Sequence, residues 1–258
     1  MMKYTWKSKY ILISSMLFIG FWEVCAILIN NDIYLPKIEC ILKEVINIIR
    51  NKDFYKYVSS SFSRTIVSYL YALFLSIILG ILSYVYPFFR YMAAPINSFI
   101  KTIPTLVLVV LALVWFDKDK APFVVGFAIV FPILYEGIQN SILKIDKSIL
   151  EMTEIYEVSL YDKITKIYIP SIKFYLISIF VSTLSLTFKV VIAGEVHGQP
   201  KYGIGSQIQL EKVNFNTTGI FAWIVIIVFI SFIFESINVI LNKRAYRWLN
   251  EDMHKKLN

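Results

Sequence analysis

The chain has 258 residues, of which 57% are hydrophobic and only 17% are charged. A soluble domain carries about 25% charged residues, so this chain has too little charge to cover a globular surface. Its 9 glycines, 8 prolines and 2 cysteines exclude disordered, collagen-like and disulfide-scaffold classes. The composition therefore predicts an integral membrane protein.

The net charge of +8 would suggest nucleic-acid binding in a soluble protein. Here the basic residues cluster where hydrophobic segments end, which is typical of topology determinants that face anionic lipid. We therefore expect membrane lipid, and no nucleic acid, as a partner. Cys25 and Cys40 show neither a CxxC pattern nor metal-ligand spacing, so we expect no metal site.

Six segments are apolar over the roughly 20 residues that cross a 30 Å hydrocarbon layer. Backbone groups in lipid must bond internally, which segments of this length can do only as helices. The sequence predicts an all-α polytopic membrane protein with about six transmembrane helices. These segments are about Tyr10–Ile29, Thr65–Phe89, Tyr91–Phe116, Ala121–Leu143, Ser171–Ala193 and Thr218–Leu241.

The first segment follows a basic start and could be a cleaved signal peptide. We favour a retained anchor, because no small-x-small cleavage site follows and Trp22-Glu23 interrupts the apolar run. Pro36 then precedes apolar residues at near-helical spacing over 38–49, which predicts an amphipathic surface helix. Pro104 should kink or break the third segment early. Residues 117–120 leave room only for a tight hairpin before the fourth.

No linker separates a second folded domain. We expect an N-terminal transmembrane helix with its amphipathic connector over 1–60, a main transmembrane domain over 61–248 and a cytoplasmic tail over 249–258. Lys and Arg are more frequent in the segments on the side of the N-terminus. By the positive-inside rule both termini are expected in the cytoplasm, as is the loop over 144–170 between helices four and five.

That cytoplasmic loop is polar but organised. Ser148 with Glu151, and Ser159 with Asp162, form capping-box patterns that predict two short helices with a break near 157–159. The second helix should carry an apolar stripe. The stripe either lies on the bilayer or, with the first helix, packs against another protein. Its members are Leu160, Ile164, Ile167 and Tyr168.

The loop resembles that of binding-protein-dependent ABC transporter permeases, which has the pattern E-A-A, three residues, G, nine residues, I-x-L-P. Glu151 matches the Glu, Ile167 the Ile and Pro170 the Pro, whereas Glu157 stands at the glycine position. Glu157 must then adopt the turn with a Cβ penalty or shift it towards Val158-Ser159.

Other segments are similar to the nitrate/sulfonate/taurine-type permeases, in matching order over roughly residues 22–248. They are Leu35-Pro36, Ser61-x-x-Arg64, Ile103-Pro104-Thr105, Leu113–Phe116, Ala193-Gly194-Glu195, Tyr202–Gly205 and the tail Lys243–Trp248.

The resemblance implies the permease subunit of an ATP-driven importer in the cell membrane, which passes a small anionic solute from an extracytoplasmic binding protein into the cytoplasm. It implies a second permease copy, as a homodimer, and a cytoplasmic ABC ATPase that binds ATP-Mg. The ATPase would couple through loop residues Glu151, Glu154, Glu157, Ser159, Leu160, Ile164, Ile167 and Pro170.

The chain has no GxxxxGK[ST] phosphate loop, so we expect no enzyme activity and no cofactor of its own. A secondary transporter without an ATPase is the alternative, but the inverted symmetry that it predicts is not found. A membrane-embedded enzyme would need clustered His, Asp or Ser-His pairs in the spans, and both histidines lie outside them. Nitrate, sulfonates, taurine, bicarbonate and vitamin precursors share the pattern, so the solute stays open.

Charged residues inside spans are costly and are by default functional candidates. They are Glu23, Lys101, Glu136, Lys189 and Glu235. Glu136 and Glu235 lie late in their spans and are expected to reach the interface. Lys189 follows a hydroxyl-rich run and either lines an anion pathway or extends to the nearby interface. The pathway candidates are Lys189, Ser185 and Thr183, with Glu195 as a residue of an outer gate.

Overall fold

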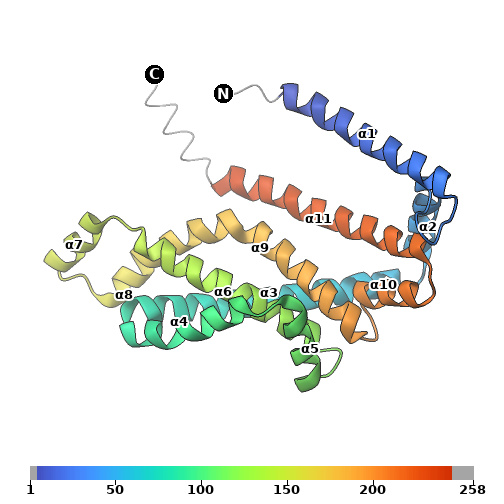
Figure 1. The fold of residues 1–258 in the computed structure, drawn as a ribbon. Helices are drawn as coiled ribbons and strands as arrows, with labels where there is room; N and C mark the ends of the chain where they lie inside the picture. The colour runs from blue at the N-terminus through green and yellow to red at the C-terminus, as the bar shows by residue number, and fades with distance from the viewer. Residues whose placement is uncertain (1–4, 246–258) are drawn as a thin grey trace. The chain divides into compact units, whose positions relative to one another are not determined.

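The computed structural model describes the backbone of residues 5–245 and the side chains of residues 10–237, and every regular element in this part of the chain is a helix (Figure 1). The helices are α1 (Thr5–Ile29), α2 (Ile38–Arg50), α3 (Phe54–Val85), α4 (Pro87–Thr102), α5 (Thr105–Trp115), α6 (Ala121–Leu143), α7 (Lys147–Ile155), α8 (Leu160–Lys163), the π-helical turn η1 (Ile164–Tyr168), α9 (Ile169–Gly198), α10 (Ile204–Val213) and α11 (Thr217–Ala245). The predicted all-α class is confirmed.

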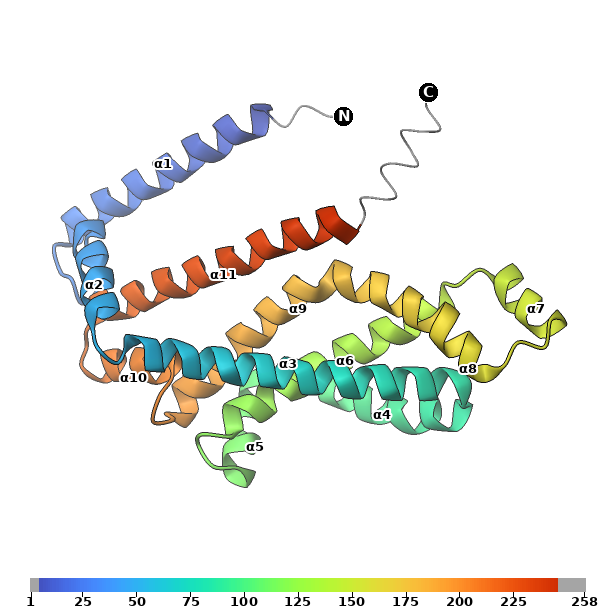
Figure 2. The same cartoon turned by 180° about the vertical axis from the view of Figure 1, so that it is seen from behind.

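Five helical runs are long and apolar enough to cross a membrane: α1, α3, α6, the run from α8 through α9, and α11. The predicted third span is not one straight helix. It is the pair α4 and α5, which are bent by 106° at a short break. Pro104 stands at that break, as its missing amide hydrogen and fixed φ predict. Figure 2 shows α5 turning away from the direction of α4.

The second span begins and ends earlier than the hydropathy pattern suggests. It starts at Phe54 instead of Thr65 and ends at Val85 instead of Phe89. Tyr86 has extended backbone angles (φ −121°, ψ 106°), because the residue before a proline is disfavoured in the helical region. Pro87 then occupies the first turn of α4, where its missing donor costs nothing.

α3 packs against α6 through a line of small residues. They recur every three or four positions and are almost completely buried: Ser61, Thr65, Ser68, Ala72, Ser76, Gly80 and Ser83. Three of the serines bond directly to α6. Ser68 donates to the carbonyl of Phe123 (2.9 Å), Ser76 donates to that of Phe131 (3.2 Å), and Ser83 accepts from the hydroxyl of Tyr135 (2.9 Å). Small side chains let membrane helices approach closely, so this line defines the α3–α6 interface.

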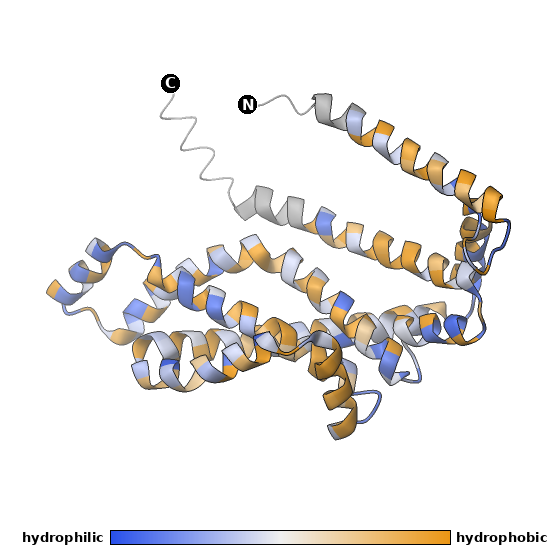
Figure 3. Ribbon diagram, viewed as in Figure 1, coloured by the Kyte–Doolittle hydropathy of each residue, from blue (hydrophilic) through white to orange (hydrophobic). Residues whose placement is uncertain are grey.

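α6 also packs along α9, and two apolar clusters mark the core. One cluster centres on Val109, Val125 and Val190 near the α5–α6 loop. The other centres on Ile138 and Ile172 towards the end that carries α7 and α8. Figure 3 shows α5 apolar all round and hydrophilic residues on α7.

The chain forms two compact units. Among the described residues, the smaller comprises those up to Tyr55 together with Gln207–Phe229, and the larger comprises Lys56–Ser206 together with residues 230–245.

In the smaller unit the Trp22 ring meets the Phe221 ring edge to face, with centroids 5.1 Å apart, and the indole donates to the Pro36 carbonyl (3.1 Å). Glu23 accepts from the amide of Ile38 (3.1 Å), the first residue of α2, so this charge in the first span satisfies an otherwise free helix donor. The amphipathic helix predicted over 38–49 is confirmed as α2, with Ile41 and Ile48 buried.

Candidate functional site

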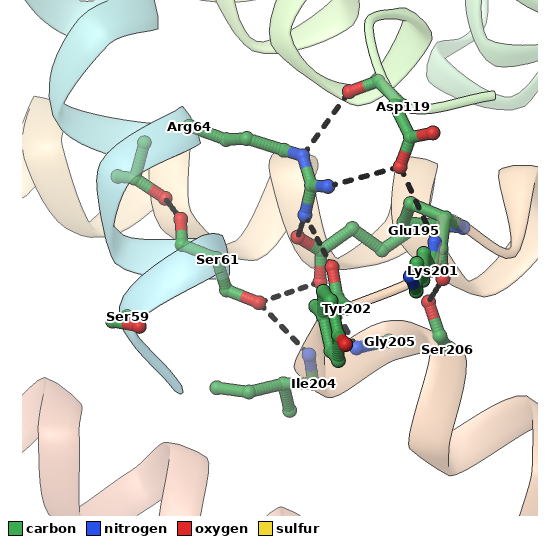
Figure 4. A network of polar contacts seen from close by, with 12 residues as sticks. Ser59, Ser61, Arg64, Asp119, Glu195, Lys201, Tyr202, Ile204, Gly205 and Ser206 are labelled. Atoms are coloured by element: carbon green, nitrogen blue, oxygen red, sulfur yellow. Dashed lines mark hydrogen bonds and ion pairs between the residues drawn. The ribbon is translucent and has the colours of Figure 1, made fainter. Parts of the chain in front are cut away.

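A buried carboxylate at one end of the larger unit joins three segments, and its arginine partner joins a fourth (Figure 4). Glu195, near the end of α9, is 0% exposed. Its Oε1 accepts from Arg64 Nη1 (2.8 Å), and its Oε2 accepts from the Ser61 hydroxyl (2.7 Å) and the Gly205 amide (3.0 Å). Arg64 and Ser61 belong to α3, whereas Gly205 belongs to the start of α10. We call this set, with Asp119 and Tyr202, the Glu195 network.

The Arg64 guanidinium uses its planar donors on three partners. Besides Glu195 it donates to the carbonyl of Tyr202 (2.7 Å) and to the carbonyl of Asp119 (3.1 Å). The Asp119 carboxylate lies 3.4 Å from the second terminal nitrogen and also accepts from the amide of Lys201 (3.2 Å). Arg64 therefore ties the α5–α6 loop and the segment after α9 to α3.

The turn between α9 and α10 fits closely around the carboxylate. The Ile204 amide donates to Ser61 Oγ (2.8 Å), so Ser61 is at once donor and acceptor. A Cβ on Gly205 would lie 2.6 Å from the Glu195 Cβ, a distance that real Cβ atoms do not show. Glycine is needed there so that the backbone can approach Glu195.

The chemistry of the Glu195 network is structural. Each Glu195 oxygen already has a donor, and the carboxylate is paired with the Arg64 guanidinium, so its contacts hold segments of the fold together. Among the described residues, no group of three or more His, Cys, Asp or Glu side chains could hold a metal ion.

Two lysines flank an aromatic ring beside this network. The ammonium groups of Lys56 and Lys201 lie 5.8 and 5.4 Å from the centroid of the Tyr202 ring. Such cation–π contacts orient both positive charges around one exposed turn.

The structure does not gather the predicted pathway residues at one place. Glu195 lies in its network, whereas Lys189 is exposed on α9 and Ser185 is half-buried. Thr183 is buried. It donates to the carbonyl of Ile179 (2.9 Å) and contacts the Tyr69 hydroxyl (3.3 Å). The roles of these residues in a pathway stay predictions.

Tyr69 also lines a groove of about 510 Å³ between α3 and α9. The walls of this groove are aliphatic and aromatic, except for Lys173 and the Tyr69 hydroxyl. The other lining residues are Leu73, Ile77, Ile169, Ile172, Leu176, Ile177 and Phe180. Such a surface suits an apolar neighbour better than a hydrated anion.

At the opposite end of the larger unit, the loop between α6 and α9 forms the two predicted short helices. The second is capped as predicted: the Asp162 amide donates to Ser159 Oγ (3.1 Å), and Ser159 Oγ donates to the Asp162 carboxylate (2.8 Å). The predicted N-cap of the first helix is wrong by two residues, because Asp146 and not Ser148 is the N-cap of α7. Hydrogen bonds from the Ser148 hydroxyl and amide lower the pKa of the Asp146 carboxyl below its usual range.

The break between α7 and α8 is a Schellman turn without glycine. Val158 N donates to the Thr153 carbonyl (2.9 Å) and Glu157 N donates to that of Glu154 (3.1 Å). Glu157 has φ 46°, in the left-handed region that favours glycine. Of the two outcomes that the sequence left open, the structure shows the turn kept at Glu157 with its Cβ penalty.

Three of the four residues of the apolar stripe face the chain's own core, which corrects for them the expectation that the stripe lies on the bilayer or on another protein. Ile164 and Ile167 pack against the cluster around Ile138 and Ile172, and Tyr168 is a buried member of it. Pro170 lies in the first turn of α9, directly after the π-helical turn η1, so the helical run passes through it.

Other residues of the loop form its exposed surface. Ile155, Tyr156 and Tyr161 are 78%, 74% and 75% exposed, and Leu160 is 45% exposed. Glu151, Glu154, Glu157 and Ser159 are exposed as well. We call the exposed apolar residues Met152, Ile155, Tyr156 and Tyr161 the α7–α8 surface. Sequence reasoning missed this surface because it followed the helical stripe and not the residues beside the break.

Two intramembrane charges that the sequence treated separately form a pair. Lys101 Nζ lies 2.7 and 2.9 Å from the two carboxylate oxygens of Glu136, which was expected to reach headgroups and basic residues at the interface. Opposite charges in neighbouring spans were the signal that could have predicted the pair. Glu235 is exposed on α11.

The family model described as "binding-protein-dependent transport system inner membrane component" matches residues 72–247. A putative ABC transporter permease protein of Methanocaldococcus jannaschii is 30% identical over 125 residues, which are 46% of this chain and 47% of that protein. The chain thus matches about half the length of that relative.

The putative aliphatic sulfonates transport permease protein SsuC of Bacillus subtilis is 23% identical over 236 residues, which cover 90% of this chain and 84% of that protein. The MetNI methionine ABC transporter in an inward-facing conformation has a chain of similar fold, with a TM-score of 0.63 at 18% identity. The similarity covers 73% of this chain and 94% of the MetNI chain.

Proposed function

The chain belongs to the family of binding-protein-dependent transport system inner membrane components, and we propose that the solute it passes is a small molecule with an anionic acid group of the sulfonate class. As a permease subunit of such an importer, the chain acts with a separate ATPase and a binding protein and has no catalytic role itself. The observation that carries the solute class is the similarity to a sulfonates permease over 90% of the chain.

The two ends of the larger unit fit the two sides of such an importer. The end with α7 and α8 is assigned to the cytoplasm, with both termini, and the Glu195 network to the extracytoplasmic side. In support, the α7–α8 surface is apolar and exposed, as a docking surface for the ATPase requires. ATP-Mg is expected on that ATPase.

A second copy of the chain completes the proposed transporter as a homodimer. Exposed apolar residues cover α4 and α5 in the single chain, among them Phe99, Val110 and Trp115. Lipid or the second copy would cover them. Alternation between outward- and inward-facing states would then move solute along the interface of the two copies.

The test uses proteoliposomes that contain the chain with its ATPase and binding protein. ATP-dependent uptake of radiolabelled ethanesulfonate and 2-aminoethanesulfonate is measured, with nitrate as a competitor. The proposal expects sulfonate uptake that stops without ATP. Uptake that persists without ATP would indicate a secondary transporter, and ATP-driven uptake of neither sulfonate would refute the solute class.

A matched pair of variants tests the assignment of the α7–α8 surface. Ile155→Glu should abolish ATPase retention, because it places a charge on the exposed apolar surface. His197→Glu introduces the same charge in the last turn of α9, at the end of the larger unit opposite α7 and α8, and this variant should retain the ATPase. Equal retention by both variants would contradict docking at α7–α8.

A further inference from the structure

A polar cluster lies between α4 and α6, apart from both the Glu195 network and the loop. Lys101 Nζ contacts both Glu136 carboxylate oxygens, at 2.7 and 2.9 Å, and Asn97 Nδ2 donates to Glu136 Oε1 (2.8 Å). Asn97 and Lys101 are one turn apart on α4, and Glu136 is on α6, against which α4 packs.

The position of this cluster favours a water-filled pathway over lipid. The side chains of Lys101 and Glu136 are 46% and 41% exposed in the single chain, although α6 and the bent pair α4–α5 are apolar enough to be candidate membrane spans. Ionisable groups in spans face protein or an aqueous cavity. Two residues beyond Lys101 the helix breaks, and the chain bends by 106°. Non-helical backbone at membrane depth likewise occurs only where it is buried in protein or lines a water-filled cavity.

One acceptor of the cluster, the amide oxygen of Asn97, has no partner within it. Asn97 is 4% exposed, and its orientation is fixed, because a flipped amide would direct its oxygen at the Glu136 carboxylate. Its Oδ1 has no hydrogen-bond partner among the described residues.

We propose that Asn97, Lys101 and Glu136 form a solute site that takes a molecule carrying both an ammonium and an acid group. The acid group lies against the ammonium of Lys101, and the solute's ammonium bonds Glu136 and Asn97 Oδ1. A solute with an acid group alone leaves Oδ1 unpaired and meets the Glu136 charge, so the site discriminates against it. This inference rests on the proposed function, in which the chain itself lines the solute's path.

The buried amide oxygen gives the site two states. Oδ1 is covered in this structure and the amide is held by its hydrogen bond to Glu136, so a donor reaches Oδ1 only after α4 moves from α6. An unpaired buried acceptor destabilises the covered state, and a bound ammonium removes that cost. Solute binding therefore favours separation of α4 and α6.

The experiment measures binding to the permease–ATPase complex in nanodiscs without binding protein, by equilibrium dialysis. Radiolabelled 2-aminoethanesulfonate and ethanesulfonate, which differ by one ammonium group, are the probes. The wild type should bind the amino compound about tenfold more tightly. Equal affinity for the two probes, or no binding of either, would overturn the proposal.

Variants assign the site to these residues. Asn97→Leu and Glu136→Gln should each reduce the discrimination to about threefold or less, and Lys101→Met should weaken both probes. The double variant Lys101→Gln/Glu136→Gln keeps side-chain shape without leaving one charge unpaired, and it should bind both weakly. Lys173→Met, which removes an exposed lysine of α9, should behave as the wild type. Wild-type discrimination in the double variant would refute the site.

The uptake assay separates this proposal from the proposed function. Sulfonate uptake driven by ATP, with equal dialysis affinity for both probes, would refute the site and leave the function standing. Absence of uptake would refute the proposed function, whereas equilibrium dialysis measures the affinity of the proposed site for each probe independently of uptake.

Discussion

The carboxylate of Glu195 and the guanidinium of Arg64 are separated by 131 positions in the chain and meet at 2.8 Å, with the carboxylate completely buried and the Arg64 side chain 15% exposed. The Ser61 hydroxyl and the Gly205 amide complete the bonding of the carboxylate. A charge so placed stabilises the fold only while its partner is present.

Loss of Arg64 should therefore destabilise the protein more than loss of both charges. Arg64→Met leaves an unpaired buried carboxylate and should cost about 3 kcal/mol or more. The double variant Arg64→Met/Glu195→Gln should recover at least half of that loss. Thermal unfolding of the detergent-solubilised protein measures both, and additive losses would show that the two residues do not act as a pair.

Glu157 offers a position for stabilisation. Because its φ is 46°, Glu157→Gly should remove a Cβ penalty of about 1 kcal/mol. Exchange of the Val158 amide, which closes the turn, should slow about fivefold in hydrogen–deuterium exchange. Glu157→Ala keeps the Cβ and should give no such gain. Faster exchange in the glycine variant would mean that the Glu157 side chain stabilises the turn.

Ile155 and Ile164 lie on the same loop but should respond differently to truncation. Ile164 packs against the core cluster, so Ile164→Ala should lower the free energy of unfolding by about 2 kcal/mol. Ile155 is 78% exposed, and Ile155→Ala should leave thermal stability unchanged in the isolated chain. The reverse order of the two melting temperatures would contradict the inward position of the stripe.

The α3–α6 interface should not accept a larger side chain. Ser76 is 0% exposed, so Ser76→Leu should destabilise the protein by about 2 kcal/mol through overpacking. Ser63 is exposed on the same helix, and Ser63→Leu is the matched control with no expected loss. Melting curves in detergent compare the two, and equal curves would mean that α3 and α6 can separate to admit the leucine.

The spans and their break could be predicted because membrane hydropathy and proline act locally. About 20 apolar residues require a helix in lipid, and Pro104 stands at the break between α4 and α5, where it lacks a backbone donor. The start of α3 was missed because residues 54–64 are polar enough to read as a connector, while the contacts of Ser61 and Arg64 with Glu195 hold them helical.

The candidate sites were harder to predict because their members come from distant positions. The sequence indicated Glu195 and, through a resemblance, Ser61 and Arg64. Nothing in the local sequence shows that Arg64 and Glu195, which are 131 positions apart, form an ion pair. The loop stripe was misassigned for a related reason. Helical spacing reveals that one face is apolar, but it does not say whether the chain's own spans or a partner covers that face.

The helical run from Leu160 to Gly198 joins the two ends of the larger unit. It contains 39 residues, which at 1.5 Å per residue span about 58 Å. Ser159 caps one end, and the carboxylate of Glu195 lies within the last turn at the other. The run therefore connects α8, through the π-helical turn η1, to the ion pair by which Glu195 is bound to Arg64 of α3.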